Sequence, residues 1–255
     1  MASGIRGRRG EKIEFADVSL LAGTRYLSAE ATTKEAVSRR AVVCFAGETK
    51  PLDKRMVTLA LQEVERLKPS PKLVIFAAFQ FDPEAAEYIN DIQWRDVTLL
   101  KAQMNPDLMT ADLKKGQQSS ESFWLVGQPD AELVKLGAEQ YKVVVRGFDY
   151  YDVKEGRLES GGCDRIAMWM LDTNYDGMSV SPSQVFFPMG GKNDGWERLA
   201  KSLRAEIDQG LIEKYAGTES LPFSAADETA IAVKIVDDRG LESIKVMHVG
   251  DGGKK

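Results

Sequence analysis

The sequence predicts an α/β lobe with three layers and a partly parallel sheet, followed by a strand-rich α+β lobe that ends in a β-hairpin. Residues 40–100 alternate continuous apolar runs with helical periodicity, which is the pattern of parallel strands joined by helices. Later segments alternate apolar and other residues, as antiparallel strands do. The 255 residues, 43% apolar and 29% charged, suffice for one large or two small cores.

The N-terminus is expected to be a flexible leader or linker, because Gly4–Gly10 is rich in glycine and arginine and has no apolar periodicity. Order is expected to begin near Lys12, where the first bulky apolar residues gather: Ile13, Phe15, Val18, Leu20 and Leu21. The predicted organisation is a leader in residues 1–11, an α/β lobe in 12–120, a strand-rich lobe in 121–250 and a tail in 251–255.

Within the first lobe, Ala41–Ala46 is a continuous apolar run and predicts a strand buried on both faces. A helix should follow, since Pro51 suits a first turn and apolar residues recur at helical spacing as far as Leu67: Leu52, Met56, Leu59, Ala60, Val64 and Leu67. The next elements are a strand at Leu73–Phe79, a helix at Pro83–Ile89 and a strand at Val97–Leu100. This order predicts parallel pairing with right-handed crossovers.

The second lobe is predicted to contain strands at Phe123–Val126, Lys142–Arg146 and Ile166–Leu171. Asp194–Asp208 is an amphipathic helix by its periodicity, and Gly210 follows it. The chain closes with a hairpin, in which the alternating segments around Ile231–Ile235 and Ile244–His248 flank an Asp-Asp-Arg-Gly turn.

Composition excludes several classes of protein. The chain has 34 Lys and Arg against 39 Asp and Glu, so any DNA contact must be a local patch on a chain of net charge −5. Two cysteines, Cys44 and Cys163, cannot form a disulfide framework or a four-thiolate zinc site, and a single histidine, His248, leaves little room for a catalytic triad. No apolar run could span a bilayer, and we expect a cytoplasmic protein.

Two acidic patterns suggest metal chemistry and have simpler interpretations. Asp172–Gly177 matches the first half of a calcium loop, but Ser183 stands where a bidentate Glu is needed, so we interpret the segment as a turn. The carboxylates between Asp149 and Asp172 could hold magnesium in a metal-dependent nuclease: Asp149, Asp152, Glu155, Asp164 and Asp172. Solvated hairpin charges are the simpler explanation. Cys44, inside an apolar run, is interpreted as a packed core thiol.

Stretches distributed over nearly the whole chain carry a family resemblance: Gly23–Ala31, Met104–Leu108, Ile166–Gly177, Leu203–Asp208 and Ile231–Val236. In order and spacing they resemble the C-terminal region of adenine-specific DNA methyltransferases related to the modification subunits of type III restriction systems. In that family, S-adenosylmethionine is bound by a separate domain with a Phe-x-Gly-x-Gly loop and an Asp-Pro-Pro-Tyr-like motif, which engages a flipped adenine. Neither motif occurs in this sequence.

The resemblance therefore implies a non-catalytic C-terminal module of such a methyltransferase, in a restriction-modification or related defence system, serving assembly or DNA engagement. The implied partners are a methyltransferase catalytic domain or subunit, a restriction subunit and DNA, with S-adenosylmethionine as the cofactor of the full-length family. The candidate DNA contacts are Lys101, Lys114, Lys115 and Arg146. The alternatives are the metal-dependent nuclease, using the Asp149–Asp172 carboxylates, and a pure oligomerisation module.

Overall fold

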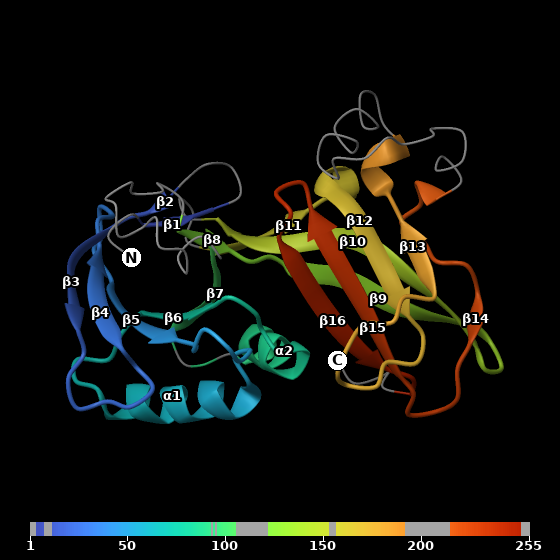
Figure 1. The fold of residues 1–255 in the computed structure, drawn as a ribbon. Coiled ribbons are helices and arrows are strands. Elements are labelled where there is room, and N and C mark those ends of the chain that lie inside the picture. The colour runs from blue at the N-terminus through green and yellow to red at the C-terminus, as the bar shows by residue number, and fades with distance from the viewer. Residues whose placement is uncertain are drawn as a thin grey trace. The chain divides into compact units, whose positions relative to one another are not determined.

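The computed structural model describes residues 4–7, 12–92, 94, 96–105, 122–152, 157–191 and 215–250 (Figure 1). The chain is a mix of α and β structure in which strands predominate. It divides into two compact units. The first consists of Met1–Val126 with Tyr150–Leu158, and the second of Gly127–Asp149 with Glu159–Lys255. The boundary predicted from the sequence lies between residues 120 and 121.

A mixed eight-stranded sheet forms the first unit. Three central strands, β5, β6 and β7, are parallel, as predicted, with Val43 opposite Ile75 and Ile75 opposite Leu100. In sheet order the strands are β2 (Lys12–Ile13), β1 (Ile5–Arg6), β8 (Phe123–Leu125), β7 (Thr98–Met104), β6 (Leu73–Ala78), β5 (Arg40–Phe45), β4 (Ala29–Thr33) and β3 (Phe15–Leu20). Strand β8 pairs with β7, so the strand predicted at Phe123–Val126 belongs to this sheet and not to the second lobe.

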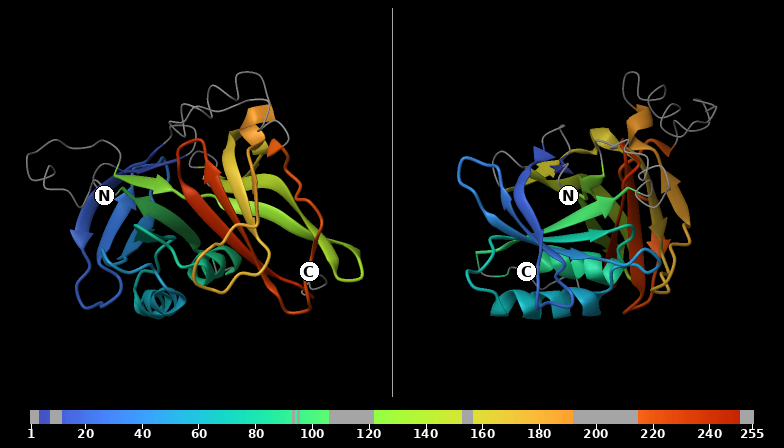
Figure 2. Two further views of the ribbon diagram at one scale, coloured as in Figure 1. Left: turned by 45° about the vertical axis from the view of Figure 1, so that its right-hand side comes forward. Right: turned by 60° about the vertical axis from the view of Figure 1, so that its left-hand side comes forward.

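Two helices connect the parallel strands, and both begin at an aspartate cap. Asp53 accepts the N–H of Met56 at the start of α1 (Lys54–Arg66), and Asp82 accepts the N–H of Glu84 at the start of α2 (Pro83–Asp91). Both helices lie on the same side of the sheet (Figure 2). They bury their apolar residues with one set of strand residues in a single core cluster. No helix in the described part of the chain combines the length and apolar character needed to cross a lipid bilayer.

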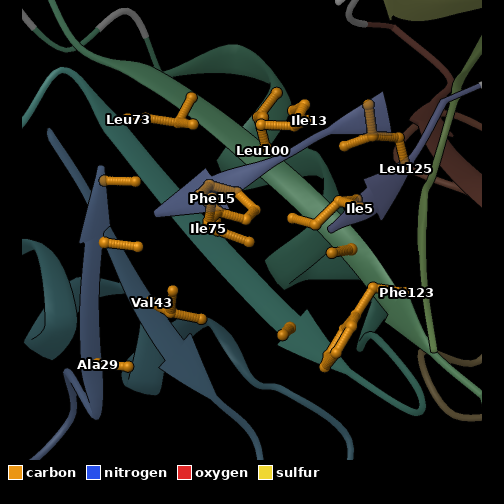
Figure 3. Packing of buried hydrophobic residues seen from close by; sticks show 14 of the residues in the cluster. Ile5, Ile13, Phe15, Ala29, Val43, Leu73, Ile75, Leu100, Phe123 and Leu125 are labelled. Carbon is orange, nitrogen blue, oxygen red and sulfur yellow. The ribbon is translucent and has the colours of Figure 1, made fainter. Parts of the chain in front are cut away.

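The opposite face of this sheet is covered by the first strands of the sheet itself. Ile5, Ile13 and Phe15 from β1, β2 and β3 pack in one cluster with Ile75 and Leu100 of the parallel strands (Figure 3). The predicted third layer is therefore a curled sheet edge and not a second layer of helices, within the residues that the structure describes. The sheet buries its own second face because its first strands carry bulky apolar side chains.

The predicted flexible leader is partly wrong, because Ile5 and Arg6 form β1. Ile5 is fully buried, and β1 pairs with β2 on one side and β8 on the other. A glycine is required beside this strand. Gly4 has a φ of 80°, and a Cβ there would lie 2.7 Å from the carbonyl oxygen of Ile13. This glycine therefore permits close backbone approach, and it does not mark a flexible segment.

The described strands after Val126 form two four-stranded sheets. In the first, β10 (Gln140–Asp152) lies between β11 (Arg157–Gly161) and β14 (Phe223–Ser224), and β9 (Gln128–Gly137) also pairs with β10. In the second, the order is β13 (Gln184–Phe186), β12 (Ile166–Asp172), β15 (Ala230–Asp237) and β16 (Glu242–His248). Short 3₁₀ turns occupy Cys163–Arg165 and Pro188–Gly191.

Several predicted elements of this unit are confirmed. Strands β10 and β12 contain the predicted segments, and β15 and β16 form the C-terminal hairpin, with Val236 opposite Glu242 before the turn. The helix predicted at Asp194–Asp208 lies outside the described residues. Trp169 is at the centre of the core between the two sheets: its ring stacks on Phe186 with centroids 4.3 Å apart, and its indole N–H donates to the carbonyl of Gly217 at 3.0 Å.

Candidate functional site

Lys101, a predicted DNA contact, lies inside the first unit. It lies on β7 and is 6% exposed. Its neighbours Leu100 and Ala102 belong to the core cluster that β1, β2 and β3 cover. Side chains alternate along a strand, so that of Lys101 points to the opposite face, which the helices cover. Burial lowers the pKa of its ammonium group to about 8. The charge of Asp91, at the end of α2, acts in the opposite direction and raises this pKa. Contrary to the prediction, Lys101 does not belong to an exposed phosphate-binding surface.

Arg146, the second predicted contact, is exposed on the outer face of β10. It forms an ion pair with Glu132 of β9. Lys142, on the same face of β10, forms an ion pair with Glu219 at 2.6 Å. The two cations are thus each matched by a carboxylate, and this part of the sheet does not concentrate positive charge as a phosphate site requires.

The remaining predicted contacts, Lys114 and Lys115, lie outside the described residues. Lys101 belongs to the first unit and Arg146 to the second. The structure therefore does not bring the four candidates together in either unit.

Of the carboxylates considered for a nuclease, the structure describes the side chains of Asp149, Asp164 and Asp172. Glu155 and the side chain of Asp152 lie outside the described part of the chain. Across the residues that are described, no group of three or more His, Cys, Asp or Glu side chains is arranged to hold a metal ion. Asp172 is buried, and both of its carboxylate oxygens accept backbone N–H groups, Oδ1 from Asn174 at 3.0 Å and Oδ2 from Ser181 at 2.7 Å.

These bonds of Asp172 confirm that the calcium-like segment is a turn. A second aspartate orders its tip: Asp176 Oδ1 accepts the N–H groups of Met178 at 2.8 Å and Ser179 at 3.1 Å, and these bonds lower the pKa of its carboxyl group. Gly177 supplies the left-handed conformation, with a φ of 81°. The loop is therefore held in one shape by its own side chains.

Met178 stands at the tip of this ordered loop and is 86% exposed. Sequence reasoning missed it, because the carboxylates of the segment carry the stronger motif. The signal was present as an apolar residue directly after Asp-Gly in a turn, where burial is not expected. Single exposed apolar side chains are common on protein surfaces, and Met178 is one that a partner can cover.

A second exposed apolar position lies at the edge of the first unit's sheet. Val18 and Leu20, on the edge strand β3, are 40% and 88% exposed, although Ile13 and Phe15 before them are buried. All four belong to the first cluster of bulky apolar residues in the sequence, and the sequence pattern does not separate buried from exposed positions among them. The β-bulge between Ala16 and Ser19 leaves Leu20 on the same face as Phe15, because Leu20 lies opposite Ala29, which belongs to the core cluster of Phe15. Leu20 is exposed because it lies on the last strand of the sheet, where the described core does not cover it.

Cys44 is a packed core thiol, as predicted. It is fully buried, and burial, with a further contribution from the charge of Glu63, raises the pKa of its thiol to about 12. Such a thiol stays protonated and is a poor nucleophile at neutral pH. His248 lies exposed at the end of β16.

The family-like stretch Gly23–Ala31 is held in place by Glu63 of α1. The Glu63 carboxylate accepts the N–H groups of Arg25 at 2.8 Å, Tyr26 at 2.9 Å and Leu27 at 3.0 Å. Burial alone would raise the pKa of Glu63, but these three backbone bonds outweigh it and the pKa is lowered. The stretch is thus part of the framework of the first unit.

Comparison of the chain with protein-family models, with curated proteins and with solved structures finds no match.

Proposed function

We propose that the chain is a non-catalytic C-terminal module of an adenine-specific DNA methyltransferase, in a restriction-modification or related defence system, and that it acts in assembly. In this proposal the chain consists of an α/β lobe followed by a strand-rich lobe with a C-terminal hairpin. What supports it is the order and spacing of the family-like stretches in the sequence. Ile166–Gly177 and Ile231–Val236 are far apart in sequence, yet they pair as β12 and β15, with Trp169 opposite Ile235.

The observation that carries the assembly role is the state of the candidate cations, which favours it over DNA engagement. Met178, 86% exposed at the tip of a loop, is one apolar side chain that a protein partner can cover. DNA engagement has less support, because Lys101 is buried and Arg146 is paired with Glu132. We therefore favour assembly over a direct contact with DNA.

The partner in this proposal is a methyltransferase catalytic domain or subunit. Methyl transfer to adenine needs S-adenosylmethionine and a pocket for the flipped base. The Phe-x-Gly-x-Gly and Asp-Pro-Pro-Tyr-like motifs that serve these purposes in the resembled family do not occur in this sequence. The chemistry is accordingly assigned to the partner, with a restriction subunit as a further member of the assembly.

The proposal is tested with the full chain and a purified adenine methyltransferase catalytic subunit from the same organism, one that carries both motifs. Calorimetry should show binding between the two proteins and no binding of S-adenosylmethionine to the chain alone. Met178→Asp should weaken binding to the catalytic subunit, because it puts a charge at the exposed apolar tip. Methyl transfer to adenine by the chain alone would overturn the proposal.

A further inference from the structure

A row of polar and aromatic side chains crosses four neighbouring strands of the first unit's sheet. Gln103 of β7 lies opposite Trp124 of β8. Trp124 lies opposite Arg6 of β1, and Arg6 lies opposite Lys12 of β2. Side chains directly opposite one another on paired strands share a face of the sheet. On its other side Gln103 lies opposite Ala78 of β6, which packs in the core cluster of the two helices, so the row lies on the helix side of the sheet.

The alternation of side chains along the strands agrees with this face. Phe123 and Leu125 flank Trp124 on β8, and Ile5 precedes Arg6 on β1. All three apolar residues belong to the core cluster on the opposite face (Figure 3). Trp124 is half-buried and belongs to none of the hydrophobic core clusters of the described residues. The row thus contains a large aromatic ring that the described cores do not use.

Lys101 lies on the same face, two residues before Gln103 on β7. It is 6% exposed, and its ammonium group has no hydrogen-bond or ion-pair partner among the described residues. The side-chain amide of Gln103 and the indole N–H of Trp124 have no hydrogen-bond partner there either. Lysine is seldom buried without a partner, because an unpaired buried charge is costly. Three polar groups without protein partners on one face therefore mark a place where a ligand supplies the partners.

The charge of this face indicates an anionic ligand. The four strands β1, β2, β7 and β8 include the cations Arg6, Lys12 and Lys101 and contain no Asp or Glu. Arg6 and Lys12 have interactions of their own, so Lys101 is the cation that we assign to the ligand. Although the Lys101 side chain is buried, its ammonium nitrogen is not fully enclosed by protein. An anionic group that reaches this nitrogen satisfies it.

We propose that this face binds a nucleotide, with the base stacked on Trp124 and a phosphate group at the Lys101 ammonium. Stacking on an aromatic side chain is the usual contact between a sheet surface and an unpaired base. The Gln103 amide offers a donor and an acceptor to the edge of that base. Neighbouring strands are about 5 Å apart, and residues i and i+2 of a strand are about 7 Å apart, so the three groups lie within reach of one nucleotide.

Stacking on Trp124 requires a base that is not enclosed in a duplex. A duplex keeps the faces of its bases in its own stack and presents phosphates on its outside, which suits an exposed cation and not a lysine that is 6% exposed. The ligand is therefore a free nucleotide or a nucleotide within a single strand. This inference goes beyond the proposed role in assembly and does not depend on the catalytic subunit.

The test is binding of nucleotides to the full chain without any other protein. Calorimetry with AMP measures binding of a free nucleotide, and fluorescence anisotropy with a short labelled single-stranded oligothymidylate measures binding of a single strand. Binding of AMP supports the inference with a free nucleotide as ligand, and binding of the oligonucleotide without AMP supports it with a single strand. Absence of both overturns it. A duplex of the same length that binds as tightly as the single strand would contradict stacking on Trp124.

Two variants test the assigned contacts. Trp124→Ala should raise the Kd of the probe that binds by about tenfold or more, and Trp124→Phe should raise it less, because phenylalanine retains a stacking surface. Lys101→Met should also raise this Kd by about tenfold or more, since it removes the partner of the phosphate. Loss of the buried charge favours the folded state, so weaker binding by Lys101→Met does not come from unfolding.

The matched control is Lys142→Met, which removes one positive charge from the second unit, where Lys142 forms an ion pair with Glu219. It should leave the Kd unchanged. Trp124→Ala or Lys101→Met chains that bind as the wild type does would overturn the inference. So would a loss in Lys142→Met equal to that in Lys101→Met, because it would indicate attraction without a site. None of these results affects the proposed assembly, since the catalytic subunit takes no part in the test.

Discussion

Glu63 on α1 holds Tyr26 by its backbone: Oε2 of the carboxylate accepts the Tyr26 N–H at 2.9 Å, between bonds to Arg25 and Leu27. Three consecutive N–H groups thus converge on one carboxylate. The stretch before β4 contains no helix or strand of its own between residues 21 and 28. Its position on the first unit depends on this side chain.

Glu63→Gln should lower the free energy of unfolding by about 1 to 3 kcal/mol at pH 7, because the amide supplies one acceptor oxygen in place of two and turns an N–H₂ group toward backbone donors. Chemical denaturation measures the change. Glu48→Gln, at an exposed position, is the control and should have little effect. Equal stabilities of Glu63→Gln and wild type would contradict the anchoring role.

The stabilisation from Glu63 should also depend on pH. The pKa of Glu63 is lowered in the folded chain, so the unfolded state binds more protons as the solution becomes acidic. The contribution is present above the unfolded pKa of the carboxyl group and is lost as pH falls through the folded pKa. The stability difference between wild type and Glu63→Gln should therefore shrink on acidification below about pH 4.

Lys101→Met should stabilise the protein. The Lys101 ammonium is buried and its pKa falls from 10.5 to about 8, which corresponds to a cost of up to about 3 kcal/mol for keeping the charge at pH 7. Methionine fills a similar volume without the charge. Urea denaturation at pH 7 should show the gain, and Lys72→Met, at an exposed position, should not.

The gain from Lys101→Met has a defined pH window. Below the folded pKa of about 8 both states of the wild type are protonated and the full cost is present. Between about 8 and 10.5 the folded lysine loses its proton while the unfolded one keeps it, so wild-type stability rises with pH relative to the variant. A stability difference that is the same at pH 7 and pH 10 would contradict burial of the ammonium.

Asp172→Asn and Asp176→Asn should differ although both remove one charge from the same loop. Asp172 uses both carboxylate oxygens, so asparagine loses the bond to Asn174 or to Ser181, with a cost of about 1 to 2 kcal/mol. Asp176 uses Oδ1 for both of its bonds, and asparagine retains that oxygen. Hydrogen exchange should show faster exchange at Ser181 in Asp172→Asn and near-wild-type exchange in Asp176→Asn.

The double variant Arg146→Gln/Glu132→Gln should leave any DNA affinity of the chain unchanged. Arg146 is paired with Glu132, so removing both partners leaves the net charge of this surface as it is. Fluorescence anisotropy with a short duplex, at two salt concentrations, measures both affinity and its salt dependence. A clear loss of affinity with a shallower salt slope in the double variant would show that Arg146 does contact phosphate.

The parallel strands were predictable because their signal is local. The run at Ala41–Ala46 is continuous in apolar residues since β5 is buried on both faces, and Pro83 is the first residue of α2. Pro51 was less exact as a signal, because α1 begins at Lys54 after the Asp53 cap. The covering of the other face of the sheet by β1, β2 and β3 was not predictable from such local patterns. Ile5 stands in a glycine- and arginine-rich stretch, and its burial depends on pairing with β8, which follows more than a hundred residues later.

The exposure of the candidate site residues was also not predictable from local sequence pattern. Lysine is seldom buried, so an exposed Lys101 was the expectation, and its burial follows from the tertiary packing of β7 beneath the helices. Leu20 is the reverse case, because a bulky apolar residue is expected in the core, whereas it is 88% exposed on the last strand of the sheet. Residue pattern predicted the elements, and long-range pairing decides which side chains reach the surface.

The central claim is that the chain assembles with a methyltransferase catalytic subunit and contributes no chemistry of its own. The most direct measurement is sedimentation of the full chain mixed with that subunit, with methyl transfer to adenine assayed in each fraction. We predict a complex that methylates DNA and a free chain that is inert. Two proteins that sediment independently, or a free chain that methylates or cleaves DNA, would contradict the account.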